Sequence, residues 1–274
     1  MSCNTSKELD IQGHRGSRGL MPENSLPAFE KAIELGVTTL ELDIAISKDK
    51  QIVVTHEPYM NPVICLKPDG SQISDSEEKI NLYKLNYEDI KQYDCGNRFH
   101  PRFPDQEKLE VYKPLLSEVF NLAKSENSKV NFNIEIKSEP DYYGVFTPQP
   151  QEYVKLVLDE INKDDMFERV NLQSFDINIL EEIKKQSPQM PVALLVDESE
   201  NISEKLEQLS FKPEIISPYF KLLTSELIQK YHNKGFKIIP WTVNDEQDMI
   251  EMLRLNVDGI ITDYPDRLIA ILYK

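Results

Sequence analysis

The chain has 274 residues, of which 31 are lysine or arginine and 47 are aspartate or glutamate, so its formal net charge at pH 7 is −16. This acidity argues against a general nucleic-acid binder or a protein that adheres to anionic membranes, because both need basic surface. No apolar run is long enough to span a bilayer, and the N-terminus lacks a basic segment followed by an apolar one. We therefore expect a soluble chain, whose oligomeric state the sequence does not indicate.

The three cysteines are Cys3, Cys65 and Cys95. Their number is odd and their spacing is not that of a metal site, so the sequence predicts no disulfide framework. Cys3 has two readings: the lipid-bearing residue of a trimmed lipoprotein, or an incidental cysteine at a frayed end. A cytoplasmic location and a periplasmic, lipid-anchored one therefore both stay open.

Strand and helix patterns begin at once and alternate along the chain. Residues 9–13 and 38–46 have the apolar pattern of buried strands, and an amphipathic helix pattern over 24–35 lies between them. A further short strand pattern covers 51–57. The interval from about 57 to 112 then breaks the rhythm, since it is rich in Pro, Asp, Tyr and Asn and too long for a plain loop. We interpret it as an insertion after the second strand.

The alternation resumes at residue 114 and continues to the end. Helix patterns cover 114–126, 151–163, 176–187, 202–210, 224–234, 245–255 and 265–273, and strand patterns cover 130–137, 169–174, 191–196, 214–218, 236–243 and 258–262. Eight strands alternating with eight helices predict a (β/α)₈ TIM barrel, forming one domain over 1–274. Two small domains would also fit the length. A doubly wound open sheet is the alternative, but no glycine-rich turn of the dinucleotide-binding kind follows the first strand.

Carboxylates on two of the strands predict a metal site. Glu41 and Asp43 are two residues apart, so in a strand they point the same way, and like charges on a buried face need a cation between them. Glu135 and Lys137 repeat this pattern in a later apolar strand. Carboxylate oxygens suit a hard cation such as Mg²⁺ or Ca²⁺. A solvated edge strand with a surface ion pair is the alternative, which the apolar neighbours of these residues disfavour.

Basic residues arrive at the same rim of the predicted barrel. His14 and Arg15 follow the first strand, and His56 follows the short strand. Arginine offers a fixed fork of donors that suits a phosphate, and histidine exchanges a proton near neutral pH. A lone histidine is as readily a structural residue, but two histidines beside an arginine, a lysine and three carboxylates predict a catalytic site.

These residues resemble the glycerophosphodiester phosphodiesterase family. The resemblance runs from the first strand to the last, through Gly13–Gly16, Pro22–Ser25, Ala28-Phe29, Gly36, Glu41–Asp43, Val54–His56, Glu135–Lys137, Gln173–Phe175, Trp241–Asn244 and Asp258–Pro265. It implies a (β/α)₈ barrel with an insertion after the second strand. It also implies a hydrolase that converts a glycerophosphodiester, a small-molecule partner, into an alcohol and glycerol 3-phosphate.

The resemblance also implies residue roles. Glu41, Asp43 and Glu135 would bind the divalent cation and His14 and His56 would be the acid/base pair, while Arg15 and Lys137 would hold phosphate oxygens. One departure concerns Glu57, because the family usually has His-Asp where this chain has His56-Glu57. The following Pro58–Asn61 replaces a common leucine-and-arginine stretch, which leaves the leaving-group side less defined than the phosphate side.

Several other residues receive expectations of their own. We expect Trp241 and Asn244 to bind substrate at the mouth, with core packing as the alternative for the tryptophan. Phe175 and Tyr219 are either core residues or contacts of a glycerol moiety. Tyr142, Tyr143 and Phe146 are expected to line the same mouth. Within Pro22–Ser25 we expect Asn24 or Ser25 to cap the first helix, with Pro27 in its first turn, and assign no catalytic role.

Two other functions remain compatible with these motifs. A phospholipase-type relative acting on intact lipid would need an exposed apolar rim or a basic face, which the −16 charge and the lack of an evident apolar loop disfavour. A non-catalytic binder of phosphorylated polyols is the other alternative. It is disfavoured because every expected catalytic position is filled.

Overall fold

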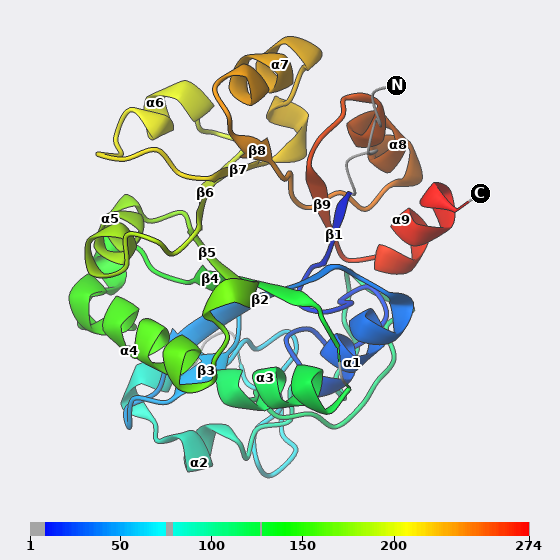
Figure 1. Ribbon diagram of the computed structural model, residues 1–274. Coiled ribbons are helices and arrows are strands. Elements are labelled where there is room, and N and C mark those ends of the chain that lie inside the picture. The colour runs from blue at the N-terminus through cyan, green and yellow to red at the C-terminus, as the bar shows by residue number, and fades with distance from the viewer. Residues whose placement is uncertain (1–8, 75–78, 127, 274) are drawn as a thin grey trace.

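The computed structural model describes residues 9–74, 79–126 and 128–273, which form a barrel of parallel strands surrounded by helices (Figure 1). The eight parallel strands of this described part are β1 (Asp10–Gly13), β2 (Thr39–Ile46), β4 (Asn131–Ile136), β5 (Val170–Ser174), β6 (Val192–Val196), β7 (Ile215–Pro218), β8 (Lys237–Ile238) and β9 (Gly259–Thr262). They pair in the order β8-β7-β6-β5-β4-β2-β1-β9. The predicted (β/α)₈ barrel is confirmed, and the doubly wound sheet is excluded.

The barrel closes between β8 and β9 through irregular backbone. A strand was expected over 236–243, but β8 has only two residues, because Pro240 has no N–H to donate to a ladder. The amide of Asp258 still donates to the carbonyl of Ile238 over 2.8 Å. The amide of Ile261 donates to the carbonyl of Pro240 over 3.0 Å. These bonds connect the last two strands, so the ends of the parallel strands form one rim.

The helices cover the outside of the barrel (Figure 1). They are α1 (Leu26–Leu35), α3 (Leu116–Ser125), α4 (Pro150–Lys163), α5 (Ile177–Gln186), α6 (Ile202–Leu206), α7 (Ser225–Asn233), α8 (Glu246–Arg254) and α9 (Pro265–Leu272), and α6 ends four residues before the predicted boundary. Helix α1 begins where expected, because the Ser25 side chain accepts from the amide of Ala28, and it ends at Gly36, whose φ of 89° favours glycine.

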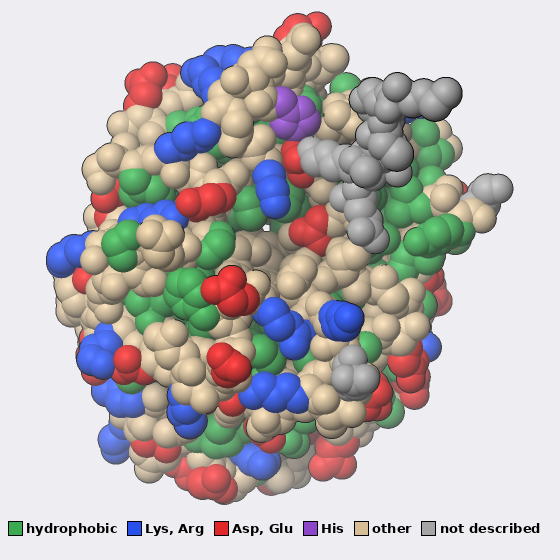
Figure 2. Space-filling view, viewed as in Figure 1, with side chains coloured by type: hydrophobic (Ala, Val, Ile, Leu, Met, Phe, Trp, Pro, Cys, Tyr) green, Lys and Arg blue, Asp and Glu red, His purple; other side chains and the backbone are tan. Residues whose placement is uncertain are grey.

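Strand β2 shows how the core positions the site. Leu40, Leu42 and Ile44 are fully buried in the main apolar cluster with residues from the surrounding helices. Because side chains alternate along a strand, Glu41 and Asp43 then point to the opposite, inner side. On the outer surface, acidic and basic side chains intermingle over the face seen in Figure 2.

The segment after β2 carries a small core of its own. Strand β3 (Ile52–Val54) pairs antiparallel with β2, and the short helix α2 (Tyr87–Ile90) was not predicted. Buried residues of this second core are Val53, Met60, Ile64, Cys65, Ile73, Leu82, Tyr87, Ile90 and Cys95. The segment folds around this small core largely through turns and isolated bridges. This explains why its sequence shows only weak hydrophobic periodicity.

The prediction of no disulfide was wrong. Cys65 and Cys95 form a disulfide across 30 residues of sequence. The amide of Leu66 donates to the carbonyl of Asp94 over 2.7 Å, and this pairing brings the two cysteines together. Counting could not find the bond, because the third cysteine, Cys3, made the total odd. The lipoprotein reading of Cys3 lies outside the described residues. Within the described ranges, no helix has the length and apolarity to cross a bilayer.

Candidate active site

A tight turn after β1 places the first two polar residues of the site. A Cβ on Gly13 would lie 2.1 Å from the carbonyl oxygen of Gly16, and Gly16 itself has a φ of 87°. Both positions therefore require glycine. Between them Arg15 also has a positive φ, of 52°, and its amide donates to Glu41 Oε2 over 3.0 Å. The turn thus fixes Arg15 against the carboxylates of β2, at the cost of backbone strain.

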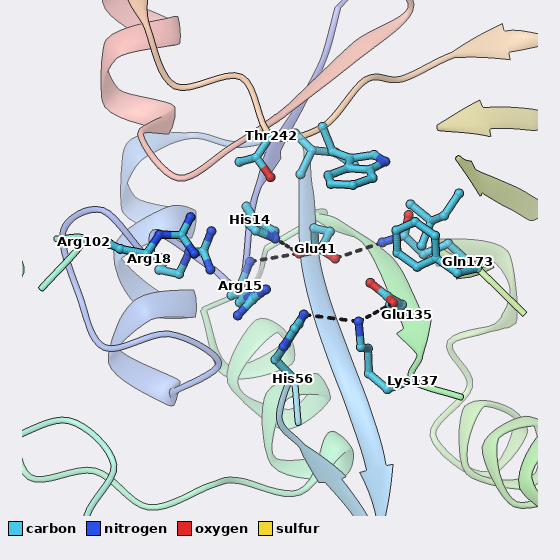
Figure 3. Close-up of a pocket in the computed structure, with 14 residues that line it drawn as sticks. His14, Arg15, Arg18, Glu41, His56, Arg102, Glu135, Lys137, Gln173 and Thr242 are labelled. Carbon is cyan, nitrogen blue, oxygen red and sulfur yellow. Dashed lines mark hydrogen bonds and ion pairs between the residues drawn. The ribbon is translucent and has the colours of Figure 1, made fainter. Parts of the chain in front are cut away.

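Three carboxylates meet inside the barrel at this rim. Asp43 of β2 stands in register with Glu135 of β4, and Glu41 lies two residues earlier on the same face. One oxygen from each of the three lies within 4.8 Å of the others, and all three side chains are buried. Figure 3 shows Glu41 and Glu135 facing the same space from adjacent strands.

Burial and neighbouring charges shift the pKa values of these three carboxylates. Burial, together with Asp43 and Glu135, raises the pKa of Glu41 well above its usual range. Burial also raises the pKa of Glu135, against the opposing charge of Lys137. For Asp43, burial is outweighed by the charge of Arg15, which holds its pKa well below the usual range. Arg15 contacts Asp43 and Lys137 contacts Glu135, whereas the basic side chain near Glu41 within the described residues is His14, 3.8 Å away.

The trio fits a divalent cation. The Oδ1 atom of Asp43 is buried without a hydrogen-bond partner among the described residues, so one carboxylate oxygen is available as a ligand. Three carboxylate oxygens from rigid strands are a donor set suited to a hard cation. Glu41, Asp43 and Glu135 are therefore the residues that could hold a metal ion, and the donor type does not choose between Mg²⁺ and Ca²⁺.

His14 is held by Asp263, the residue that directly follows the last strand. Its Nδ1 atom lies 2.6 Å from Asp263 Oδ1, and Arg18 donates to both oxygens of the same carboxylate. Burial first, and Arg18 next, lower the pKa of His14 to about 4 despite the nearby Asp263. With Nδ1–H donating to Asp263, Nε2 faces the pocket and lies 3.8 Å from Glu41 Oε2. Sequence reasoning quoted Asp263 in a motif but missed this role.

His56 lies on the other side of the carboxylates. Its Nδ1 atom is 2.9 Å from Glu57 Oε1, and its Nε2 atom is 3.2 Å from Lys137 Nζ. Lys137 also donates to Glu135 over 2.7 Å. Figure 3 shows His56 and Lys137 side by side below Glu41, with His14 above them. Glu57 therefore orients His56, so the departure from the His-Asp pattern keeps a carboxylate in contact with the ring.

The motif Pro22–Ser25 is part of the site, contrary to the purely structural reading. Ser25 is the helix cap, but Asn24 donates to Asp43 Oδ2 over 2.9 Å. Glu23 accepts from Arg15 over 2.7 Å. The sequence contained a signal for this role. The motif Pro22–Ser25 belongs to the family resemblance, and it combines the helix cap Ser25 with the carboxylate of Glu23.

A polar network supports Glu41 from inside the barrel. Gln173 of β5 donates to Glu41 Oε1 over 2.9 Å and accepts from Asn133 over 3.0 Å. Asn133 donates also to Gln12, which in turn donates to Asp10. Because ligands of a metal are oriented by such neighbours, Gln173 is a positioning residue that sequence reasoning missed.

The remaining expectations about the mouth were met only in part. Trp241 and Phe175 line the pocket with their rings 5.4 Å apart, while Tyr219 packs behind Trp241. Asn244 does not line it, because its amide group donates to Asp263 and accepts from the Asp263 amide. Tyr142, Tyr143 and Phe146 are not among the residues that line this pocket. Tyr143 donates to Asp176, and Phe146 packs against Tyr59 and Tyr142.

The pocket between these groups is lined mainly by polar side chains (Figure 3). Its lining residues in the described part are His14, Arg15, Arg18, Glu41, His56, Arg102, Glu135, Lys137, Gln173, Phe175, Leu195, Trp241, Thr242 and Ile261. Basic groups, carboxylates and a small apolar wall thus face one another across one cavity. This combination suits a compact anionic ligand with an uncharged part.

Comparisons with known proteins agree with this arrangement. The model of the glycerophosphoryl diester phosphodiesterase family matches residues 14–267. A glycerophosphodiester phosphodiesterase from Caldanaerobacter subterraneus is 32% identical, over 96% of this chain and 98% of the relative. A lysophospholipase D from Homo sapiens is 23% identical, over 93% of this chain and 83% of the relative.

Solved structures share the fold along the whole chain. A protein from Silicibacter pomeroyi, provisionally assigned as a glycerophosphoryl diester phosphodiesterase, is 29% identical with a TM-score of 0.87, over 98% of this chain and 95% of that one. A phosphodiesterase from Oleispira antarctica, solved with the product sn-glycerol-3-phosphate, is 20% identical with a TM-score of 0.77, over 97% of each chain. By the match to its family model, this chain belongs to the glycerophosphoryl diester phosphodiesterase family.

Proposed function

We propose that this protein is a metal-dependent phosphodiesterase that hydrolyses glycerophosphodiesters to an alcohol and glycerol 3-phosphate. The observation that carries the proposal is a cluster of three buried carboxylates, Glu41, Asp43 and Glu135, at a cavity that Glu41 and Glu135 line together with His14 and His56. The relative from Caldanaerobacter subterraneus bears the name of this activity, and the Oleispira antarctica protein binds the proposed product.

Glu41, Asp43 and Glu135 would hold the cation, which supplies positive charge against the phosphate and lowers the barrier that its own negative charge creates. Arg15 and Lys137 bind the non-bridging oxygens. Both side chains are held by carboxylates of the site, Arg15 by Glu23 and Lys137 by Glu135, so their positions are set before the substrate arrives.

The two histidines supply proton transfer. One accepts the proton of the nucleophile, either water or the neighbouring glycerol hydroxyl, and the other donates a proton to the departing alcohol oxygen. Attack by the glycerol hydroxyl gives a cyclic phosphate, which water then opens. His14 is oriented by Asp263 and His56 by Glu57, so each ring presents one nitrogen to the pocket.

The test is the release of glycerol 3-phosphate from choline, ethanolamine and glycerol esters, with chelator and with added Mg²⁺ or Ca²⁺. We expect release that depends on the metal and has a bell-shaped pH profile, and we expect His14→Ala and His56→Ala each to remove one limb or nearly all activity. Release unaffected by chelator would contradict the metal assignment. Retention of the full profile in His56→Ala would show that this residue is structural.

A further inference from the structure

The pocket contains one cation that no described residue neutralises. Among the basic side chains of the lining, His14 and Arg18 contact Asp263, His56 contacts Glu57, and Arg15 and Lys137 also have carboxylate partners. Arg102 is exposed at the pocket and has no carboxylate within 4.0 Å in the described part of the chain.

The segment that carries Arg102 is fixed against the turn after β1. Gln106 donates to the carbonyl of Arg18 over 2.6 Å, and the amide of Glu107 donates to that of Leu20 over 2.9 Å. Phe103 is buried, and its ring lies 4.8 Å from the Arg18 guanidinium and 5.5 Å from that of Arg102. The insertion therefore presents Arg102 from an anchored base, which reduces the entropy lost when a ligand binds.

The two sides of the pocket differ in chemistry. Figure 3 shows Arg102 and Arg18 together on one side, across from Gln173. Phe175, two residues after Gln173, and Trp241 give the pocket an aromatic wall. Glycerol carries no charge, and the proposed function assigns the phosphate oxygens to Arg15 and Lys137, so a further anion that Arg102 recognises would lie on the other alcohol of the diester.

We propose that Arg102 is a specificity-determining residue that favours glycerophosphodiesters whose second alcohol carries an additional anionic group, a carboxylate or a phosphate. This inference rests on the proposed function. A guanidinium donates two parallel hydrogen bonds to either group, so the two anions share one recognition chemistry. The insertion after β2 thus selects the alcohol through one defined contact.

Matched substrate pairs separate this contact from general binding. Glycerophosphoserine and glycerophosphoethanolamine differ by one carboxylate, and glycerophosphoglycerol is compared with its terminal phosphomonoester. The ratio of kcat/KM within each pair is measured for the wild type, Arg102→Gln, Arg102→Glu and Arg102→Lys. Lys108→Gln is the control, because Lys108 is an exposed cation of the same insertion that does not line the pocket.

We expect Arg102→Gln to lower the preference for the anionic member about tenfold in at least one pair. Arg102→Glu should lower it further, and Lys108→Gln should leave it unchanged. Arg102→Lys should keep only part of it, because lysine retains the positive charge but not the two parallel hydrogen bonds. The pair that responds identifies carboxylate or phosphate as the group recognised. A ratio that is equal in wild type and Arg102→Gln for both pairs, or one that falls as much in Lys108→Gln, overturns the proposal.

Calorimetric binding of the same pairs keeps this test separate from the proposed reaction. A wild type that releases no glycerol 3-phosphate from any ester contradicts the proposed function, whereas the ratio of Kd within each pair still tests Arg102. We expect the Kd of the neutral member divided by that of the anionic member to be lower in Arg102→Gln than in the wild type. In the wild type this ratio should also decrease as salt is raised, because Arg102 is exposed. Equal ratios of Kd in both proteins overturn the assignment of Arg102.

Discussion

His14 Nδ1 lies 2.6 Å from Asp263 Oδ1, although 249 residues separate the two in sequence. The first and last strands of the barrel are neighbours, so their carboxyl ends deliver the two side chains to one point. Because Asp263 also accepts from Arg18 and Asn244, its carboxylate is fixed in position and ionised, and His14 is locked in one ring orientation.

Asp263→Asn should lower kcat by at least about a hundredfold, because an amide no longer fixes the proton on Nδ1 of His14. KM should change much less, since Asp263 does not line the pocket. The variant should also be less stable, because Arg18 loses its bidentate partner in a buried place. The measurement is kcat and KM at saturating metal, beside urea unfolding.

Asp258→Asn is the matched control for Asp263→Asn. Asp258 is a buried carboxylate at the other end of β9, where it accepts from His232 and the Ile238 amide. It should lower stability and leave kcat close to the wild-type value. A comparable loss of kcat in both variants would show that the Asp263 effect is only a loss of fold.

Glu41→Gln should raise the melting temperature of the metal-free protein at pH 7 to 8 and abolish the further rise that metal gives the wild type. The pKa of Glu41 is raised in the fold, so its contribution is most favourable at low pH and is lost as pH rises above the pKa of the unfolded chain. The amide in Glu41→Gln carries no charge, so this loss of stability at higher pH disappears. The variant also lacks one carboxylate ligand for the metal, so metal no longer raises the melting temperature. Melting curves with chelator and with Mg²⁺ or Ca²⁺, from pH 5 to 8, give the measurement.

A lower melting temperature of Glu41→Gln in chelator would contradict the repulsion within the trio. A metal-induced rise equal to that of the wild type would contradict the assignment of Glu41 as a ligand. The two outcomes are independent of activity, so they test the site even if the proposed reaction is wrong.

Gln173→Met should weaken metal affinity about tenfold while leaving kcat at saturating metal largely intact. Its amide orients Glu41, and loss of such a neighbour typically lowers affinity by this order. Isothermal titration of the metal gives the affinity. Ser174→Ala is the control, because Ser174 lies on the same strand, donates to the Ile136 carbonyl and accepts from the Asp176 amide, with no carboxylate as hydrogen-bond partner in the described part of the chain. Equal affinity in Gln173→Met and wild type would remove the positioning role.

Replacing Cys65 and Cys95 together by serine should lower the free energy of unfolding by roughly 3 kcal/mol, because the bond closes a loop of about 30 residues. Reductant should cause a similar loss in the wild type and none in the double variant. Denaturant unfolding with and without reductant measures both. A wild type whose stability is the same with and without reductant would show that the bond does not stabilise the protein.

The sequence by itself determined the architecture and the family, and it indicated several residues of the candidate site. Apolar strands alternating with amphipathic helices are a local pattern, so the barrel and its insertion could be predicted, and the family is confirmed by the match over 14–267. The spacing of Glu41 and Asp43 placed both on one side of β2, because the side-chain period of a strand is two.

Only the tertiary structure decided which groups complete the site. Asp263 reaches His14, Gln173 reaches Glu41, and Asn24 reaches Asp43 through contacts between distant elements, which no local pattern encodes. The disulfide and the position of Arg102 depend on an insertion that folds through turns around its own small core. Periodicity reports which face of an element is buried, whereas the partner on that face is fixed by how the elements pack.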